Sequence, residues 1–437
     1  MYRLLLIFAL SFSMVSNSNA DWPQFRGPDG QGVARNANIP LTWSESENVS
    51  WAVKIPGKGW SSPVVQGDRI WLTTAVTSEP TEEQIKTQLE KSTLDEKQFT
   101  RRQVAGTVLL RVMCLDRKSG SIEHDIEFAN VDSPEAIHIG NSYASPTPVI
   151  EGDQLYVHFG IDGTACIDTR TGKVLWRRAV DVFYSVGVGS SPVLYKDLLI
   201  LICDGVDKQF IIALNKETGE RVWRTDRPPI RAPDGQQKKA YSTPLVIHHE
   251  GRDQLICPGS QWFISYDPLT GKEIWRVDHG SGFSLIPRPV FGDGIVYVCT
   301  GYGRPELWAI RVDGKGDVTE THVEWTEKSQ ISNNPSPLLV DDLIFVISDN
   351  GIASCLDART GETHWKERIG GNHSASPVYA SGRVYFFNHE GETTAVKASS
   401  EFESLATSTI EGQLMASPAV LKSCLILRSD TKLYCVE

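Results

Sequence analysis

A short element centred on proline recurs eight times along this 437-residue chain, and its period constrains the fold more than any other feature. A typical copy has a small or polar residue, the proline, two apolar residues, a turn and a second apolar run, as in "SSPVLYKDLLIL". After the first, longer interval, the copies follow one another at about 40–50 residues, which is the period of propeller and solenoid repeats. The eight prolines are Pro63, Pro148, Pro192, Pro244, Pro289, Pro337, Pro377 and Pro418.

The residues that follow each proline predict four short strands. In the seventh copy, "SASPVYA", "RVYFFN" and "TTAVKA" are strand-like runs separated by the turns "SG" and "HEG". The sixth copy continues through "RTG" into "ETHWKERI", a fourth strand. Proline suits the start of a strand, because its missing N–H loses no ladder bond there. Four antiparallel strands in each unit predict an all-β fold, an eight-bladed β-propeller.

A second motif, Asp or Asn followed by Thr-Gly and then Trp, recurs before the fourth strand. It appears as "CIDTRTGKVLWRRAV" at 166–180 and returns with Trp223, Trp275 and Trp365. The Asp and Gly suit a tight turn, and a ring that buries about 150–250 Å² suits a wedge between adjacent blades. The motif therefore predicts contacts between blades rather than a cofactor site. Three blades depart from it: the first has His124 in place of Trp, the fifth reaches Trp325 late, and the seventh has neither Gly nor Trp.

The ends of the repeat array predict how the ring closes. The eighth copy stops after its third strand, while an unassigned strand with a tryptophan, residues 49–54, precedes the first proline. Because a closed ring leaves no exposed edge, we expect residues 49–54 to complete the last blade. Residues 77–107, rich in Glu, Lys and Gln, predict a short helical insertion in blade 1. We expect an N-terminal extension at 21–48 and a single propeller domain at 49–437.

The first twenty residues predict export. Arg3 precedes an apolar run too short to span a bilayer, and Ser18-x-Ala20 resembles a cleavage site. We therefore expect a signal peptide at 1–20 and a periplasmic or cell-envelope location. No later segment is apolar and long enough for a transmembrane span. The net charge of −11 disfavours nucleic acid and anionic membrane surfaces as partners. We expect a monomer.

The cysteines and histidines give no motif of a metal or haem site. Most of the eight cysteines occupy equivalent offsets in separate repeats, as Cys166 and Cys355 do, too far apart for disulfides. Buried free thiols are therefore expected. The chain contains no Cys-x-x-Cys-His, no His-x-x-x-His, no Gly-x-Ser-x-Gly and no Walker loop. We accordingly expect no metal and no cofactor.

The Asp-x-x-Thr-Gly-x-x-x-Trp repeat resembles the docking motif of the quinoprotein (PQQ) dehydrogenase propellers and of the related non-catalytic propellers typified by BamB. The start "DWPQFRGPDGQGVA…SENVSWAVKIPGKGWSSPVV" is similar to those families and to exported PQQ-like repeat proteins common in planctomycetes, with Trp22, Arg26, Gly27, Asn48, Val49 and Trp51 in matching places. The resemblance covers nearly all of the expected mature chain and implies the propeller fold. It implies one of two activities, a dehydrogenase or a non-catalytic binding protein, because the same architecture hosts both.

We expect a non-catalytic scaffold that binds a protein or an envelope component. The alternative is a quinoprotein dehydrogenase that holds PQQ and Ca²⁺ in the central funnel. For that activity the resemblance implies an adjacent pair of cysteines, carboxylate and amide calcium ligands, an Asp base and an Arg partner. The chain has no adjacent cysteine pair. The dehydrogenases of the family are also much longer.

If the protein binds a ligand, we expect it in the loops that lead into the innermost strand of each blade, which line one mouth of the central channel. Aromatic, amide, imidazole and guanidinium groups that meet there suit a carboxylate, a sugar or a peptide. The candidates are Trp60, His138, Asn141, Tyr143, Tyr184, Arg231, Tyr241, Arg288, Asn333, Asn334 and His373. A merely polar, solvated loop surface is the alternative interpretation. Residues 77–107 have the same two interpretations, a solvated decoration or an arm that docks a partner.

Overall fold

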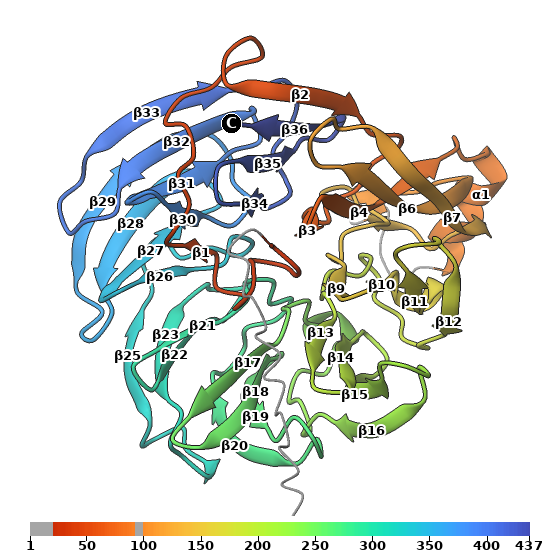
Figure 1. Ribbon diagram of the computed structural model, residues 1–437. Helices are drawn as coiled ribbons and strands as arrows, with labels where there is room; N and C mark the ends of the chain where they lie inside the picture. The colour runs from red at the N-terminus through yellow and green to blue at the C-terminus, as the bar shows by residue number, and fades with distance from the viewer. Residues whose placement is uncertain (1–20, 92–98) are drawn as a thin grey trace, which may run out of the picture.

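The computed structural model, which describes residues 21–91 and 99–437, is a ring of eight four-stranded antiparallel sheets (Figure 1). The predicted all-β, eight-bladed propeller is therefore confirmed. The predicted signal peptide at 1–20 and part of the predicted insertion, 92–98, lie outside the described residues. Within the described ranges, no helix is long and apolar enough to cross a membrane.

In every blade the innermost strand is short and begins at or just after the repeated proline. Blade 1 consists of β3 (Val64–Gln66), β4 (Arg69–Thr77), β6 (Thr107–Asp116) and β7 (Ile122–Asp132). Blade 2 consists of β9 (Val149–Glu151), β10 (Gln154–His158), β11 (Thr164–Asp168) and β12 (Val174–Arg178). Blade 3 consists of β13 (Val193–Tyr195), β14 (Leu198–Asp204), β15 (Gln209–Asn215) and β16 (Arg221–Asp226). Blade 4 consists of β17 (Leu245–His249), β18 (Arg252–Pro258), β19 (Trp262–Tyr266) and β20 (Glu273–Asp278), with β24 (Gly316–Asp317) parallel at its edge.

The remaining blades follow the same order from the centre outward. Blade 5 consists of β21 (Val290–Gly292), β22 (Ile295–Cys299), β23 (Leu307–Arg311) and β25 (Val323–Glu327). Blade 6 consists of β26 (Leu338–Val340), β27 (Leu343–Ile347), β28 (Ile352–Asp357) and β29 (Thr363–Arg368). Blade 7 consists of β30 (Val378–Ala380), β31 (Arg383–Phe387), β32 (Glu392–Lys397) and β33 (Ser404–Thr409), with β1 (Val33–Ala34) beside β30. Blade 8 consists of β34 (Ala419–Val420), β35 (Leu425–Arg428), β36 (Lys432–Val436) and β2 (Val49–Lys54).

The last blade confirms the predicted closure, because β2 pairs antiparallel with β36, as in Trp51 opposite Cys435. Figure 1 shows β2 on the outer side of β36. The insertion is also confirmed: α1 (Glu82–Lys91) lies between β4 and β6. Another piece of the insertion, β5 (Arg102–Gln103), pairs with β8 (Ile137–His138) in a separate two-stranded sheet. Two single-turn 3-10 helices, η1 (Gly160–Asp162) and η2 (Gly235–Gln237), lie in loops.

The repeated tryptophans lie between blades, as predicted. Trp176 of blade 2 is buried, and its indole N–H donates to the Lys216 carbonyl in the next blade's turn (2.8 Å). Gly219 of that turn has a φ of +69°, and a Cβ there would lie 2.5 Å from the indole of Trp176. The turn therefore requires glycine for both its backbone conformation and its contact with the ring. Trp51, Trp223, Trp325 and Trp365 donate in the same way to the next blade.

Blade 7, which lacks the tryptophan, receives one from the N-terminal extension. Trp43 is buried, and its ring stacks on Tyr385 of β31 with centroids 6.1 Å apart. The equivalent ring in blade 6, Phe345, contacts that blade's own Trp365 at 6.0 Å. Trp43 also donates its backbone N–H to the Ser408 hydroxyl on β33 (3.0 Å). The extension thus fills a gap in the hydrophobic core between blades 7 and 8.

The residue before each repeated proline joins neighbouring blades around the channel. In six junctions its backbone N–H donates to the hydroxyl of the equivalent residue in the next blade, at 2.9–3.0 Å; the pairs are Ser62–Thr147, Thr147–Ser191, Ser191–Thr243, Arg288–Ser336, Ser336–Ser376 and Ser376–Ser417. Two of the eight junctions lack this bond: in blade 5 the residue is Arg288, which has no hydroxyl, and between blades 8 and 1 the Ser62 hydroxyl has no partner among the described residues. The recurring small polar residue before proline is therefore a connection between blades.

Candidate functional site

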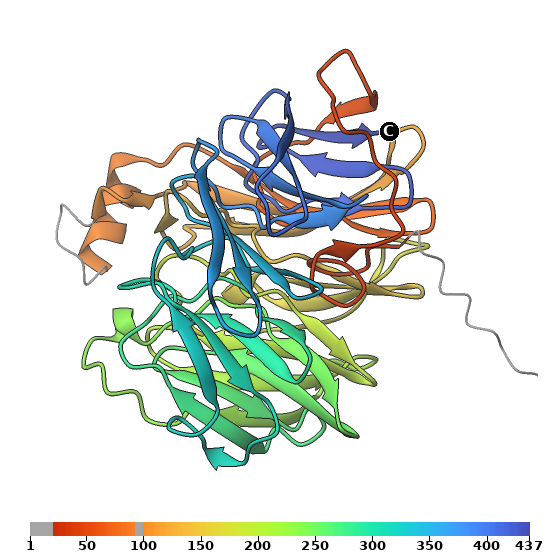
Figure 2. The same ribbon diagram turned by 90° about the vertical axis from the view of Figure 1, so that its left-hand side faces the viewer.

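The two ends of the central channel differ. The N-terminal extension crosses the end where the innermost strands finish, which we name the covered mouth: Pro23 accepts from Ile150 of β9, Gly32 from Tyr379 of β30, and Gln31 from Phe291 of β21. The predicted ligand loops lie at the other end, the entry mouth. Figure 2 shows the extension and α1 on opposite faces of the ring.

Arg288 does not offer its side chain to a ligand at the entry mouth. It is 2% exposed, and its guanidinium donates to the carbonyls of Phe25 (2.5 Å) and Pro244 (3.2 Å) and to Gln24. Gly30, with a φ of +74°, leaves room for it, since a Cβ there would lie 2.5 Å from the guanidinium. Burial lowers the pKa of Arg288 to about 10. Arg288 therefore fixes the N-terminal extension over the covered mouth.

Several other predicted residues are engaged in contacts within the loops. The Asn141 amide donates to the carbonyls of Val186 (2.8 Å) and Val188 (3.3 Å). Tyr143 donates to the Glu135 carbonyl (2.9 Å). Tyr241 donates to the Tyr184 carbonyl (2.9 Å), and both rings are buried. These groups shape the mouth and leave few polar atoms free for a ligand.

Asn333, Asn334 and Arg231 are held by carboxylates. Asp349 accepts four hydrogen bonds from the backbone and side-chain N–H groups of Asn333 and Asn334, at 2.6–3.1 Å. Arg231, although 64% exposed, forms a two-point ion pair with Asp278. The polar groups of Asn333, Asn334 and Arg231 are thus already satisfied by these two carboxylates. Trp60 is half-buried and donates to the Gly140 carbonyl (3.2 Å).

His373 is buried, with Nε2 hydrogen-bonded to the Gly370 carbonyl (2.9 Å). Burial lowers its pKa, so the ring is held neutral. Its Nδ1 has no partner among residues 21–91 and 99–437. This nitrogen is buried and thus not exposed to a ligand, and a neutral imidazole adds no charge to the mouth.

His138 lies in a different environment, a group of cations that sequence reasoning did not identify. We name Arg101, Arg102 and Lys239, whose charges act on His138, the cationic cluster. β5 brings Arg102 to the mouth by pairing with β8, where Arg102 lies opposite His138, and Arg101 directly precedes β5. Lys239 is 5% exposed and donates to the Gln236 amide oxygen (2.6 Å). The pairing of β5 with β8 could not be predicted, because each strand has only two residues and the intervening sequence carries no repeat.

Lys239 forms no ion pair within the described residues. Burial and then Arg102 lower the pKa of Lys239 to about 8, while the charge of Asp234 opposes the shift. Burial and the neighbouring cations also lower the pKa of His138. The Arg102 guanidinium forms no ion pair within the described part of the chain, and burial lowers its pKa as well. Since a desolvated cation is costly unless an anion compensates it, the cluster is suited to bind a carboxylate or another anion.

The eight cysteines are all buried free thiols, as the repeat offsets predict. None lies at an adjacent position in the sequence, so the disulfide that the dehydrogenase resemblance implies cannot form. Two carboxylates near the mouth, Asp349 and Asp278, are occupied by the internal donors described above. The residues present therefore do not fit the family's arrangement for PQQ and Ca²⁺.

The fold and its repeat define a PQQ-like β-propeller. The family model described as outer membrane protein assembly factor BamB matches residues 111–367 and 259–399, more than half of the chain, and the chain belongs to this family. A relative, outer membrane protein assembly factor BamB of Yersinia pestis, is 20% identical over 310 residues, which cover 66% of this chain and 72% of the relative.

Solved structures share the fold at low identity. BamB from Moraxella catarrhalis superposes with a TM-score of 0.57 at 14% identity, covering 88% of this chain and 98% of that chain. Quinohemoprotein alcohol dehydrogenase from Comamonas testosteroni gives a TM-score of 0.52 at 13% identity, covering 95% of this chain and 80% of that chain. A BamB protein and an alcohol dehydrogenase thus both resemble this ring in fold, and the residues of the site must decide between the two functions.

Proposed function

We propose that this protein is an exported, non-catalytic propeller scaffold of the cell envelope that binds a protein partner through the entry mouth. The cationic cluster carries the proposal, because Lys239 and Arg102 are desolvated and form no ion pair within the described residues. An acidic group of the partner would compensate that charge. The family's described role in outer membrane protein assembly supports a protein as the partner. The predicted signal peptide supports the envelope location.

The alternative, a quinoprotein dehydrogenase, has weaker support. The dehydrogenase structures resemble this chain in fold alone, at 13% identity for the Comamonas enzyme. The occupied carboxylates at the mouth and the missing cysteine pair argue against a PQQ site. Incubation of the purified protein with PQQ and Ca²⁺, followed by dialysis, an absorbance spectrum and an assay of dye-linked alcohol oxidation, tests this directly. Retained quinone with turnover would establish the dehydrogenase and refute the scaffold.

The scaffold proposal is tested with a hexaglutamate peptide as probe and with cross-linking in envelope extracts. We expect the wild-type protein to bind the peptide in a salt-dependent manner and the double variant Arg102→Ala/Lys239→Ala to lose roughly tenfold or more in affinity. The same variant is expected to lose the cross-linked partner. Lys173→Ala/Arg221→Ala is the matched control, because both cations are exposed at the starts of the outer strands β12 and β16. Equal binding by all three proteins would refute the proposed surface.

A further inference from the structure

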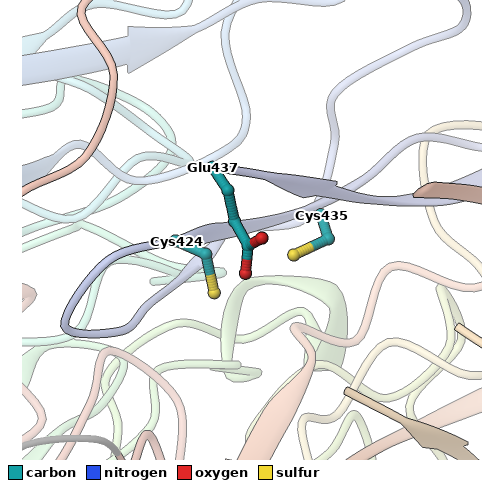
Figure 3. A group of neighbouring side chains, drawn as sticks. All are labelled: Cys424, Cys435 and Glu437. Atoms are coloured by element: carbon teal, nitrogen blue, oxygen red, sulfur yellow. The ribbon is translucent and has the colours of Figure 1, made fainter. Parts of the chain in front are cut away.

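Three side chains that can ligate a metal converge at the end of the last blade. Cys424 closes the tight turn between β34 and β35, where its carbonyl accepts from the Leu421 N–H (2.8 Å). In the β35–β36 ladder Leu425 lies opposite Val436, and Ile426 opposite Cys435. Because alternate residues of a strand share a face, Cys424, Cys435 and Glu437 project to the same side. Figure 3 shows their side chains directed toward one another.

The three groups are close enough to hold one ion. The two sulfurs and one Glu437 carboxylate oxygen all lie within 4.8 Å of one another. Both cysteines are fully buried, whereas Glu437 is exposed, so the group is closed on the protein side and open to solvent at the carboxylate. The Ser50 hydroxyl of β2 donates to Glu437 Oε2 (2.8 Å) and orients the carboxylate. A hydrogen bond of this kind is typical support for a metal ligand.

The surrounding charge favours a divalent cation. Two thiolates and a carboxylate carry three negative charges, and Arg117 from the β6–β7 turn of blade 1 interacts with the Cys424 thiol. Asp68 holds the Arg117 side chain in place (3.0 Å). A dication would offset two of the three negative charges of these ligands. Sulfur ligands select zinc-like ions over Mg²⁺ and Ca²⁺, which require oxygen ligands.

We propose that Cys424, Cys435 and Glu437 bind one thiophilic divalent cation such as zinc at the junction of the last and first blades. Water or another small ligand completes the fourth position on the exposed side, as in open tetrahedral sites. The site lies apart from the cationic cluster and does not depend on the scaffold role. It joins the β34–β35 turn to β36, the strand on which β2 closes the ring.

The test titrates Co²⁺ into the full, reduced, metal-free protein. We expect one equivalent to bind with a sulfur-to-cobalt charge-transfer band, and Zn²⁺ to displace it. Cys424→Ser and Cys435→Ser should abolish the band. Cys355→Ser is the matched control, because Cys355 is equally buried in blade 6 but outside the group, and it should leave the band unchanged. No binding, or a band that survives in both Cys424→Ser and Cys435→Ser, would overturn the proposal.

Glu437→Gln keeps the test decisive if the serine variants fail to fold. Glu437 is exposed, so its substitution should leave the fold intact while it weakens Co²⁺ affinity by roughly tenfold or more. Unchanged affinity would remove the carboxylate from the site and contradict the proposed ligand set. Peptide mapping of protein isolated without reductant gives a second readout. Thiols that resist alkylation before chelation and react after it support the metal site, whereas thiols that react equally in both states, or a Cys424–Cys435 disulfide, overturn it.

Discussion

The covered mouth and the entry mouth of the channel both contain buried cations, but the hydrogen-bond acceptors of these cations differ. At the covered mouth Arg26 donates to the carbonyls of Gln31 (2.7 Å), Pro337 (2.8 Å) and Pro377 (3.3 Å), and Arg288 holds Phe25. At the entry mouth the Lys239 ammonium has, among the described residues, an amide oxygen as its sole hydrogen-bond acceptor. Buried cations that satisfy backbone carbonyls hold the fold together, whereas those without such partners are available to an external anion.

Burial lowers the pKa of Arg26 at the covered mouth and of Lys239 at the entry mouth, but the two groups differ in whether they can lose their charge. Burial and then the neighbouring Arg288 lower the pKa of Arg26 to about 9, while Asp29 opposes the shift. Arg26 therefore stays charged near neutral pH. Lys239, with its pKa lowered to about 8, loses its proton within an accessible range. Arg26 is thus a permanent structural charge, whereas a ligand and pH can both influence the charge of Lys239.

Removal of the segment that forms the covered mouth should have the largest effect. We expect deletion of residues 21–55 to abolish cooperative folding, because it removes β2, Trp43 and the contacts of Arg26 and Arg288 together. Without β2, β36 presents an open edge that promotes aggregation. Circular dichroism melting and size-exclusion chromatography measure this. A truncated chain that melts cooperatively near the full-length temperature would contradict the closure argument.

Trp43→Ala tests whether the extension is part of the core. We expect a loss of about 3–5 kcal/mol in the free energy of unfolding, because a fully packed indole leaves a cavity against Tyr385. Urea denaturation measures it. Phe402→Ala is the control, since this partly exposed ring contacts Trp365 at the rim of the same blade. Phe402→Ala should lose much less free energy of unfolding than Trp43→Ala. Similar small losses for both variants would show that the extension only decorates the ring.

Arg288→Ala and Arg288→Ser test whether the Arg288 cation stabilises the fold. We expect Arg288→Ala to lose about 1–3 kcal/mol, because the Phe25 carbonyl loses its donor. Arg288→Ser should lose less, since a hydroxyl at this position matches the other blades and can accept from the Thr243 N–H. Denaturation midpoints of the pair decide this. A serine variant no more stable than the alanine variant would contradict the proposed hydroxyl ring.

Unlike the Arg288 variants, Lys239→Met should not destabilise the fold. Removal of a desolvated charge is expected to leave stability unchanged or to raise it by about 1–3 kcal/mol, while hexaglutamate binding falls. Because the folded-state pKa lies below the unfolded value of 10.5, the wild-type chain gains stability as pH rises from about 8. The difference between wild type and Lys239→Met should therefore shrink above that pH. A marked destabilisation by Lys239→Met at pH 7 would assign Lys239 to the fold.

The smallest expected effect is the pH dependence of anion binding. Hexaglutamate affinity should fall by a few fold as pH rises through about 8, because Lys239 loses its proton and Arg102 remains charged. Calorimetric titrations across that range measure it. In Lys239→Ala the pH dependence should disappear. A wild-type affinity that stays constant through this range would exclude Lys239 from the binding surface.

The fold could be predicted in detail because its determinants are local and repeated. Each Pro element starts an inner strand, and each Thr-Gly turn precedes an outer one, so eight copies indicated the number of blades. The motif also located Trp176 and its equivalents between blades, since a large apolar ring in an outer strand needs a neighbour to cover it. The lone strand at 49–54 indicated closure by the same reasoning. These features depend on patterns within about 50 residues.

The candidate site could be predicted only in part. The Pro repeat identifies the loops that lead into the innermost strands, but it does not predict the contacts of their residues, because a sequence does not show that Asp349 already satisfies Asn333 and Asn334. Arg288 shares the position before proline with seven hydroxyl-bearing residues and stands out in the sequence, yet its partner lies more than 250 positions earlier, at Phe25. The predicted ligand role of the mouth residues stays a prediction.

By itself, the sequence determined the β-propeller and the number of its blades, because hydrophobic period and turn chemistry act over short distances. It also indicated how the ring closes, because the last copy lacks a fourth strand and residues 49–54 supply an unassigned one. Only the tertiary structure decided which charges meet. Ring closure places Arg117 of blade 1 beside Cys424 of blade 8, and a two-residue pairing places Arg102 beside His138. Such neighbours depend on the path of the whole chain, and no local pattern encodes them.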